Sequence, residues 1–213
     1  MSLRIGVIGS GQVAQVLARG FAAEGHTVRI GTRDAGKLAE FAQSSGVSVG
    51  AVAEVASEAE VVILAVKGTA AEPVVAALAS ELAGKVVIDA TNPIADVPPE
   101  DGVLVYFTQA NESLMERLQV LAPEARFVKA FNSVGNHLFI HPQLQGGRPT
   151  MFICGNDAGA KAQVGGLLDQ VGWAVEDVGT VKGARALEPL CQLWCATGFL
   201  HKTWGHAFAY LRG

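Results

Sequence analysis

The fold is decided by the stretch Leu3-Arg4-Ile5-Gly6-Val7-Ile8-Gly9-Ser10-Gly11-Gln12-Val13-Ala14. Its first half is a short apolar run rich in β-branched residues, which predicts a buried strand. Its second half has the G-x-G-x-x-A spacing of a turn that binds a dinucleotide pyrophosphate. A segment with helical apolar spacing follows, and a second apolar run, 27–30, closes on Gly31-Thr32-Arg33. The order strand, glycine turn, helix, strand predicts a βαβ unit.

Each small residue of this turn is required for a physical reason. Gly9 lets the chain turn sharply out of the strand. Gly11 has no side chain, so a pyrophosphate can approach the backbone, and Ala14 lets helix and strand pack closely. The helix that follows directs its free N–H groups and its positive end toward the phosphates. Small residues also make purely structural turns, but this turn lies between a strand and a helix, as nucleotide binding requires.

The tip of the second strand selects the nucleotide. A unit that binds NAD usually carries Asp or Glu there, where the carboxylate holds the ribose 2′-hydroxyl. This chain has Thr32 and Arg33 instead, with Lys37 one turn later. A hydroxyl, a guanidinium and an ammonium group suit a 2′-phosphate, so we expect NADP(H). The alternative is a solvated helix start in which Arg33 and Lys37 pair with Asp34 or Glu40, and Asp34 itself is a candidate helix cap.

Composition excludes several classes of protein. The chain has 213 residues, of which 50% are hydrophobic and 17% charged, enough to bury a large core. A formal net charge of −4 without a long basic run argues against a nucleic-acid partner. No stretch has the length and apolarity of a membrane span, and the N-terminus enters the first strand without a signal peptide, so we expect a cytoplasmic protein. Three cysteines without metal spacing are expected to be free thiols.

Strands and helices alternate along the rest of the chain, which predicts an α/β protein with a Rossmann-type, doubly wound, mostly parallel sheet. We expect residues 1–145 to form this dinucleotide-binding domain and residues 146–213 to form a small C-terminal α/β and helical extension, with the acceptor site and a dimer interface. Expected strands are 46–49, 60–66, 85–90, 126–130, 150–154 and 173–178. Expected helices are 37–44, 51–57, 70–82 with Pro73 in its first turn, 113–121, 133–141, 158–171 and 184–211, the last interrupted near Gly198 and Gly205.

Ligands of such a sheet bind beyond the carboxyl ends of its strands. After the third long strand come Ala65, Val66 and Lys67, which we expect over the nicotinamide ribose; a loop lysine exposed to solvent is the alternative for Lys67. Asn92, at the end of the next strand, can bond to the nicotinamide carboxamide or form an Asx turn. The bond between Asn92 and Pro93 can be cis or trans.

The strand 126–130 ends in a further group of candidate residues. Ala130, Asn132 and Ser133 are placed to frame the nicotinamide ring, or Ser133 to cap a helix. No nucleophile–base or paired-carboxylate arrangement stands out, so we expect no catalytic side chain beyond positioning roles for Asn92, Asn132 and Ser133. We expect no metal site; His201 and His206, in the aromatic tail, are expected in the core or an interface rather than as metal ligands.

Several segments together resemble the NADPH-dependent reductases of the deazaflavin coenzyme F420. The same domain type forms the NADPH-oxidising part of the six-transmembrane metalloreductases. The segments that carry the resemblance are the glycine turn, Gly31-Thr32-Arg33, Val128-Lys129-Ala130-Phe131-Asn132, Phe152-Ile153-Cys154-Gly155-Asn156-Asp157, and the stretch from Ala184-Arg185 to Leu187-Glu188-Pro189-Leu190. The last two are the most specific of them.

The resemblance implies an NADP(H)-binding enzyme, often dimeric. By position, Thr32 and Arg33 hold the 2′-phosphate, Ser10, Gln12 and Val13 approach the pyrophosphate, and Ala130 and Asn132 flank the nicotinamide. Arg185 and Glu188 lie one helical turn apart, where they can pair with each other. A deazaflavin or flavin partner (F420, FMN or FAD) would lie against the nicotinamide, near the central strand ends and the C-terminal extension.

The predicted function is therefore hydride transfer between NADPH and a deazaflavin- or flavin-type acceptor, by a homodimer. In this reaction the stacking of two rings matters more than a side-chain acid. The alternatives are a reductase of another small molecule, such as an imine or a quinone, and an NADP(H) sensor without turnover. The loops at Val66-Lys67-Gly68 and at Asn92 differ from those of the deazaflavin reductases, so the identity of the acceptor stays open.

Overall fold

Six parallel strands form the main sheet in the computed structural model, which describes residues 2–213. The strands are β1 (Arg4–Ile8), β2 (Thr27–Gly31), β3 (Ser48–Gly50), β4 (Val61–Leu64), β5 (Val86–Asp89) and β6 (Arg126–Lys129). Their order is β3-β2-β1-β4-β5-β6, and Val7 of β1 lies beside both Ile30 and Ile63. The order reverses between β1 and β4, where doubly wound sheets bind dinucleotides.

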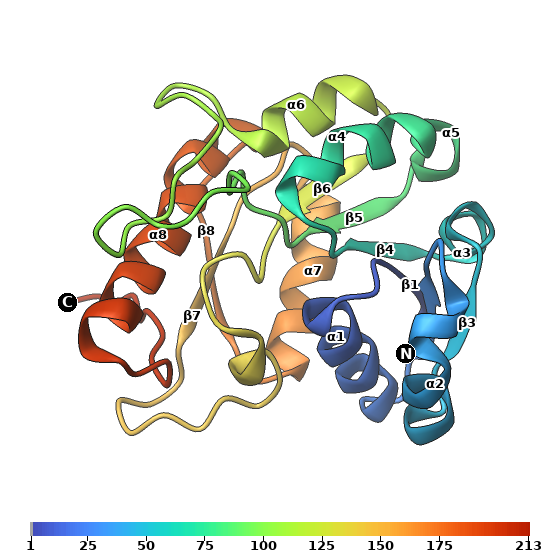
Figure 1. Ribbon diagram of the computed structural model, residues 1–213, viewed down its shortest axis with the longest axis horizontal. Helices are drawn as coiled ribbons and strands as arrows, with labels where there is room; N and C mark the ends of the chain where they lie inside the picture. Colours follow the sequence, from blue (N-terminus) through green and yellow to red (C-terminus); the bar gives the residue numbers. More distant parts are fainter. Residues whose placement is uncertain (1) are drawn as a thin grey trace.

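Helices cover both faces of this sheet (Figure 1). They are α1 (Gln12–Ala23), α2 (Ala39–Ser45), α3 (Val52–Glu58), α4 (Gly68–Ala77), α5 (Ala79–Leu82) and α6 (Leu114–Leu121). Alternate residues of each strand point to opposite faces, so two apolar cores form. Val7, Ile63 and Ile88 pack with α1 and α2, whereas Val62 and Val87 pack with the helices α3 to α6. The doubly wound fold predicted from the sequence is confirmed.

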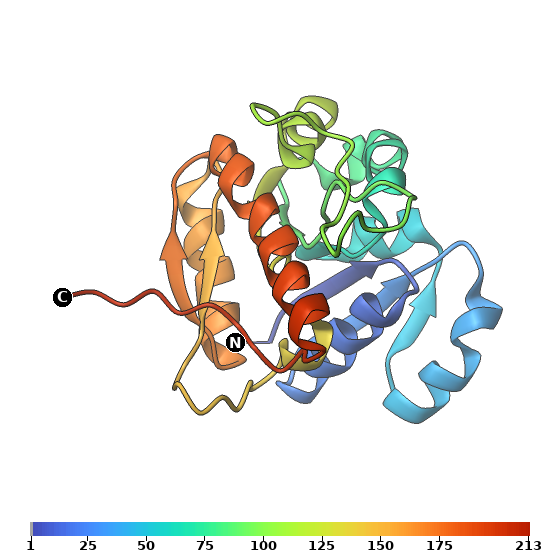
Figure 2. The same cartoon turned by 60° about the vertical axis from the view of Figure 1, so that its left-hand side comes forward.

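A smaller unit completes the chain. Its strands β7 (Thr150–Ile153) and β8 (Ala174–Asp177) pair in parallel, connected by α7 (Ala158–Gln170), which packs into the same core as α1. The long α8 (Ala184–His201) follows and runs across the molecule beside the main sheet, as Figure 2 shows. Lys129 donates its backbone N–H to the Cys154 carbonyl at 3.0 Å, which joins the small unit to the edge strand β6.

Four of the expected helices differ in the structure. Residues 37–44 begin as a 3₁₀ turn, Ala35–Leu38, before α2. The expected helix 70–82 starts earlier, at Gly68, so Pro73 lies in its second turn, and it bends at Leu78, which lets both Leu78 and Leu82 pack into one core. Between 133 and 141 only Asn136–Leu138 forms a 3₁₀ turn, because Gly135 is extended and its missing Cβ leaves room for Trp194.

The C-terminal segment shows the fourth difference. The helix does not break at Gly198. It ends at His201, and the next residue, Lys202, is left-handed with a φ of 53°. The chain then folds back, and Trp204 and His206 pack on Trp194 at ring distances of 5.2 and 4.9 Å. The Phe208 carbonyl accepts the N–H of Thr150, at the start of β7. Aromatic packing has therefore replaced the expected helical continuation to 211.

The sequence also raises the questions of a membrane span, of the state of the cysteines and of a metal site. Within 2–213, no helix combines the length and the apolar character that crossing a bilayer needs. The three cysteines are free thiols. His206 accepts or donates a hydrogen bond with Thr197 at 2.9 Å, and no cluster of potential metal ligands occurs in the described part of the chain.

Candidate functional site

The glycine turn between β1 and α1 lies at the carboxyl edge of the sheet. Gly9 has a φ of 141°, and a Cβ there would lie 2.2 Å from the Ala65 carbonyl oxygen, so only glycine fits. A Cβ on Gly11, by contrast, would meet no atom within 4 Å. The space beside Gly11 is therefore open at the place where the motif expects a pyrophosphate.

The N-terminus of α1 is free to bind an anion. Gly11 is its N-cap, and no side chain accepts a hydrogen bond from the first turn. The first N–H groups of α1 have no intrahelical partners, because they begin the helix. They border the open space, where Gln12 is exposed and Ser10 and Val13 are half-buried. The Gln15 side chain donates to the Ser10 carbonyl at 3.0 Å and holds the turn in place. Residues and geometry thus fit a diphosphate.

The tip of β2 carries the residues expected at the 2′-phosphate. Thr32 accepts the N–H of Asp34 at 3.2 Å, and Asp34 caps the following 3₁₀ turn by accepting the N–H of Gly36, which confirms its expected role. Lys37 lies 4.0 Å from the Asp34 carboxylate. Arg33 is exposed and has neither a hydrogen bond nor an ion pair among residues 2–213. Arg33 is therefore a cation available to a ligand, and Lys37 is partly neutralised.

The loops after β4 and β5 contact each other. A Cβ on Gly68 would lie only 1.9 Å from the Asn92 carbonyl oxygen, so glycine is required for this approach. Ala65 is buried, Val66 is half-buried, and the exposed Lys67 pairs with Asp96 at 3.3 Å. Lys67 is thus an exposed loop lysine with a partner of its own.

Asn92 and Asn132 bind each other at the ends of β5 and β6. Asn92 donates to the Asn132 carbonyl at 2.7 Å, and Asn132 donates to the Asn92 side-chain oxygen at 3.1 Å and to the Leu187 carbonyl at 2.8 Å. The peptide bond before Pro93 is trans. The Asn132 side-chain oxygen is buried and has no partner within 2–213, so one acceptor remains free at this edge.

Backbone strain marks the segment between Ala130 and Ser133, both of which are buried. Phe131 has a φ of 62°, which is costly for a bulky side chain. Its ring packs edge-on against Phe139 at 5.1 Å and Phe21 at 6.3 Å, and this packing holds the conformation. Strain of this kind is concentrated at ligand sites, and here it orients Asn132 toward α8.

A buried charge network is centred on Lys129, the residue that precedes this segment. The Lys129 ammonium is 2.7 Å from the Asp89 carboxylate and 2.9 Å from that of Glu188, and it donates to the Thr91 carbonyl at 2.9 Å. Complete burial by itself would lower the pKa of Lys129, but the two carboxylates outweigh it and the pKa is raised. Glu188 also accepts the N–H groups of Leu114 and Met115, at the positive end of α6.

The sequence reasoning missed this network. The spacing allows Glu188 to pair with Arg185, but Arg185 pairs with Glu116 at 2.7 Å, where its hydrogen bonds lower the pKa of the Glu116 carboxyl. One signal was present, since Asp89 and Lys129 each end an apolar strand and are register partners in β5 and β6. Opposite charges at matched positions of two buried strands indicate a buried ion pair.

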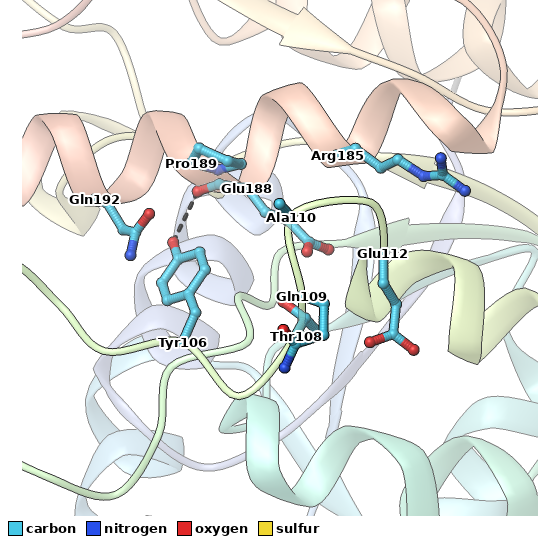
Figure 3. A pocket seen from close by; sticks show the side chains of 9 residues that line it. All are labelled: Tyr106, Thr108, Gln109, Ala110, Glu112, Arg185, Glu188, Pro189 and Gln192. Atoms are coloured by element: carbon cyan, nitrogen blue, oxygen red, sulfur yellow. Dashed lines mark hydrogen bonds between the residues drawn. The ribbon is translucent and has the colours of Figure 1, made fainter.

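A pocket of about 300 Å³ opens between α8 and the loop that follows β5 (Figure 3). Its lining includes Tyr106, Thr108, Gln109, Glu112 and Gln192. Tyr106 donates its hydroxyl to the Glu188 carbonyl at 2.7 Å, and burial raises the pKa of this phenol. This pocket could not be predicted from local sequence patterns, because its walls lie far apart in the chain.

The structure brings most of the predicted residues to one edge of the sheet. Residues 9–13, 32–33, 65–67, 92 and 130–133 follow the carboxyl ends of neighbouring parallel strands. Thr32, Arg33 and Lys37 lie on the β2 side, and the asparagine pair lies on the β5–β6 side. The geometry fits an extended dinucleotide that crosses the edge from β2 to β5.

Comparison with known proteins places the chain in a family. A family model described as NADP oxidoreductase, coenzyme F420-dependent, matches residues 4–93. The crystal structure of a putative F420-dependent NADP reductase from Arthrobacter sp. is 33% identical, with a TM-score of 0.92, and the match covers 99% of this chain and 100% of that one. A hypothetical protein from Sinorhizobium meliloti is 29% identical, with a TM-score of 0.71 over 85% and 86% of the two chains.

A curated relative extends the comparison. Rat metalloreductase STEAP3 is 29% identical over 187 residues, which are 88% of this chain and 36% of the relative, so the chain spans about a third of that protein. The fold matches that of the Arthrobacter structure over nearly the whole chain, and the resemblance noted in the sequence is confirmed. The chain belongs to the family of coenzyme F420-dependent NADP oxidoreductases and is an NADP-dependent oxidoreductase.

Proposed function

We propose that this protein transfers a hydride between NADPH and a deazaflavin- or flavin-type acceptor at the carboxyl edge of the main sheet. The part of this proposal that concerns NADPH rests on one observation, the open space at Gly11 together with the unpaired Arg33 at the tip of β2. The part that concerns the acceptor is supported by the family and by the side chains that follow β5 and β6. These are the amides of Asn92 and Asn132 instead of an acid–base pair.

Each predicted residue has a role in this proposal. The glycine turn, with Ser10, Gln12 and Val13, binds the pyrophosphate, and Thr32, Arg33 and Lys37 bind the 2′-phosphate. Ala65, Val66 and Lys67 border the nicotinamide ribose. Asn92, Ala130, Asn132 and Ser133 border the nicotinamide, where the two asparagines hydrogen-bond to each other. Since Asn92 and Asn132 fix each other, the site is ordered before the ligand binds.

The chemistry needs little from the side chains. When bound, the reduced nicotinamide would supply a hydride from its C4 to position 5 of the acceptor ring, becoming NADP⁺, and one proton from water would complete the reduced ring. No side chain near Asn132 has to take or give a proton, so the contribution of the protein is orientation and the exclusion of water.

We also propose that residues 1–145 form the dinucleotide-binding domain and residues 146–213 an extension that completes the acceptor side. Two contacts support the packing of the extension against the acceptor side of this domain. Leu187 of the extension accepts from Asn132, and Glu188 binds Lys129. The extension thus holds the residues beside the nicotinamide in place.

The proposed reaction is tested by following NADPH absorbance at 340 nm under anaerobic conditions with F420, riboflavin, FMN and a quinone. We expect NADPH oxidation with at least one deazaflavin or flavin, and much slower oxidation with NADH. Tight NADPH binding without oxidation by any of these ring acceptors would contradict the proposal and favour a nucleotide sensor.

A further inference from the structure

The buried charge network of Asp89, Lys129 and Glu188 lies next in the chain to the residues proposed beside the nicotinamide. Asp89 accepts both the N–H and the hydroxyl of Thr91, at 2.9 and 2.6 Å, and Asn92 is the residue that follows. Lys129 is the last residue of β6, and Glu188 lies in α8. The network therefore joins the ends of two neighbouring strands to the long helix of the extension.

Stability alone does not account for such a network. The side chains of Asp89 and Lys129 are fully buried and that of Glu188 is 2% exposed, so all three charges have lost their water. This desolvation offsets much of their mutual attraction, and apolar side chains of similar size often stabilise a fold as well. What a hydrogen-bonded network of buried charges adds is one definite arrangement of the segments that it joins.

The Glu188 carboxylate is held from three directions. One oxygen accepts the N–H of Leu114 at 3.0 Å, and the other accepts that of Met115 at 3.1 Å and faces the Lys129 ammonium at 2.9 Å. The backbone carbonyl of Glu188 also accepts the Tyr106 hydroxyl at 2.7 Å, as Figure 3 shows. These contacts fix where this turn of α8 lies relative to β6 and to the start of α6.

The asparagine pair depends on the same turn of α8. Leu187, the neighbour of Glu188, accepts a hydrogen bond from the Asn132 amide at 2.8 Å. The same amide nitrogen donates to the Asn92 side chain at 3.1 Å. A shift of α8 would remove the first of these bonds and free the Asn132 amide to rotate away from Asn92. The orientation of the pair therefore depends on a helix that Glu188 holds in place.

The network also holds one end of a strained segment. Phe131, with a φ of 62°, lies between Lys129 and Asn132. A bulky residue keeps such a conformation only where its surroundings impose it. Here Lys129 is fixed by two carboxylates, and its backbone N–H bonds to the Cys154 carbonyl at 3.0 Å. The network thus fixes the point from which the chain turns toward Asn132.

We propose, on the basis of the function proposed above, that Asp89, Lys129 and Glu188 form a positioning network for the nicotinamide half of the nucleotide. All three side chains are buried, and they act through Asn92 and Asn132, whose amides they hold in one orientation. The phosphate-binding residues follow β1 and β2, which do not pair with β5 or β6, so they are independent of the network.

Two ligands separate the two halves of the nucleotide site. NADPH carries the nicotinamide, and 2′-phospho-ADP-ribose is the same molecule without that ring. Glu188→Gln removes one carboxylate and leaves Lys129 paired with Asp89, so this variant is expected to fold. It should raise the Kd for NADPH about fivefold or more, because the asparagine pair is no longer preorganised, and leave the Kd for 2′-phospho-ADP-ribose within about twofold. Isothermal titration calorimetry measures both constants.

Two further variants sharpen the test. Glu116→Gln is the matched control, since Glu116 also binds α8, through Arg185 at 2.7 Å, but none of its hydrogen bonds within residues 2–213 reaches the asparagine pair. It should leave the ratio of the two Kd values unchanged. Thr91→Val keeps the three charges and the shape of the side chain, and removes only the hydroxyl bond to Asp89. It should raise the ratio about threefold.

A double-mutant cycle tests whether the network acts through Asn132. Asn132→Ala alone should raise the ratio of the Kd for NADPH to that for 2′-phospho-ADP-ribose. Adding Glu188→Gln to Asn132→Ala should then raise this ratio by less than about twofold, because the group that Glu188 positions is already gone. Independent effects, in which the double variant shows the product of the two single changes, would contradict the inference.

The outcomes separate this inference from the function on which it rests. An unchanged ratio in both Glu188→Gln and Thr91→Val, or an equal rise in Glu116→Gln, would overturn the inference and leave the proposed function standing. NADPH binding without reduction of any ring acceptor would contradict the proposed function alone, since the ratio is measured without an acceptor. If the unmodified chain binds neither ligand, the proposed function fails, and the inference fails with it.

Discussion

Replacing Arg33 with Ala is expected to raise the Kd for NADPH roughly ten- to one-hundredfold and to leave the Kd for NADH within about twofold. The loss is that of one charge-assisted contact to phosphate, on the order of 1.5–3 kcal/mol. The effect is selective because only NADPH carries the 2′-phosphate. Since Arg33 has no partner within residues 2–213, its removal also leaves no carboxylate unpaired. Fluorescence titration of reduced nucleotide with each variant measures both constants.

Arg19→Ala is the matched control for this substitution. Arg19 is also exposed, and it lies farther along α1, where its guanidinium stacks 5.2 Å from the centre of the Phe41 ring. The same change in net charge there should alter neither Kd by more than about twofold, because exposed charges at a distance are screened. Equal losses of NADPH and NADH affinity in Arg33→Ala would contradict the role assigned to Arg33.

Replacing Lys129 with Met is expected to cause the largest loss of stability, about 3–5 kcal/mol. The methionine leaves the Asp89 and Glu188 carboxylates buried beside each other without a cation. For a chain of this size, such a loss lowers the Tm by roughly 6–20 °C. Thermal unfolding followed by circular dichroism measures it.

The same substitution at Lys161 provides the comparison. Lys161 pairs with Asp177 at 2.7 Å, but Asp177 is half-exposed, so water can replace the lost ammonium. Lys161→Met is expected to cost about 1 kcal/mol or less. If Lys129→Met lowered the Tm no more than Lys161→Met does, the network would not be the stabilising link between the extension and the main sheet.

The pH dependence of this contribution follows from the raised pKa of Lys129. A group whose pKa is higher in the folded chain stabilises it fully below the pKa of the unfolded chain, about 10.4 for lysine. The contribution is lost only as pH rises through the higher pKa of the folded state. The contribution of the Lys129 ammonium to the stability of the unmodified chain should therefore be constant between about pH 6 and pH 9.

The parts of the fold that depend on local sequence were predictable. The turn at Gly9 and Gly11 follows from steric limits on a few residues, and the central strands follow from their unbroken apolar runs. The cap at Asp34 and that at Ser113, which accepts the N–H of Glu116, are likewise local. Each of these features is decided within a few positions of the chain.

The remaining features depend on contacts between distant segments. The charge network joins residues 89, 129 and 188, and the pocket joins the loop after β5 to α8. The segment 133–141 forms only a 3₁₀ turn because Trp194 occupies the space beside Gly135, and the tail after Lys202 folds back because Trp204 packs against Gly198. Helical periodicity alone cannot predict these outcomes, since tertiary packing overrides it.

The central claim is that the glycine turn and Arg33 form an NADP(H) site. Isothermal titration calorimetry of the unmodified chain with NADPH and with NADH tests it most directly. We expect one site per chain and a Kd for NADPH at least about tenfold lower than that for NADH. The absence of binding heat with both nucleotides under conditions where the chain is folded, or equal affinity for the two, would contradict the claim.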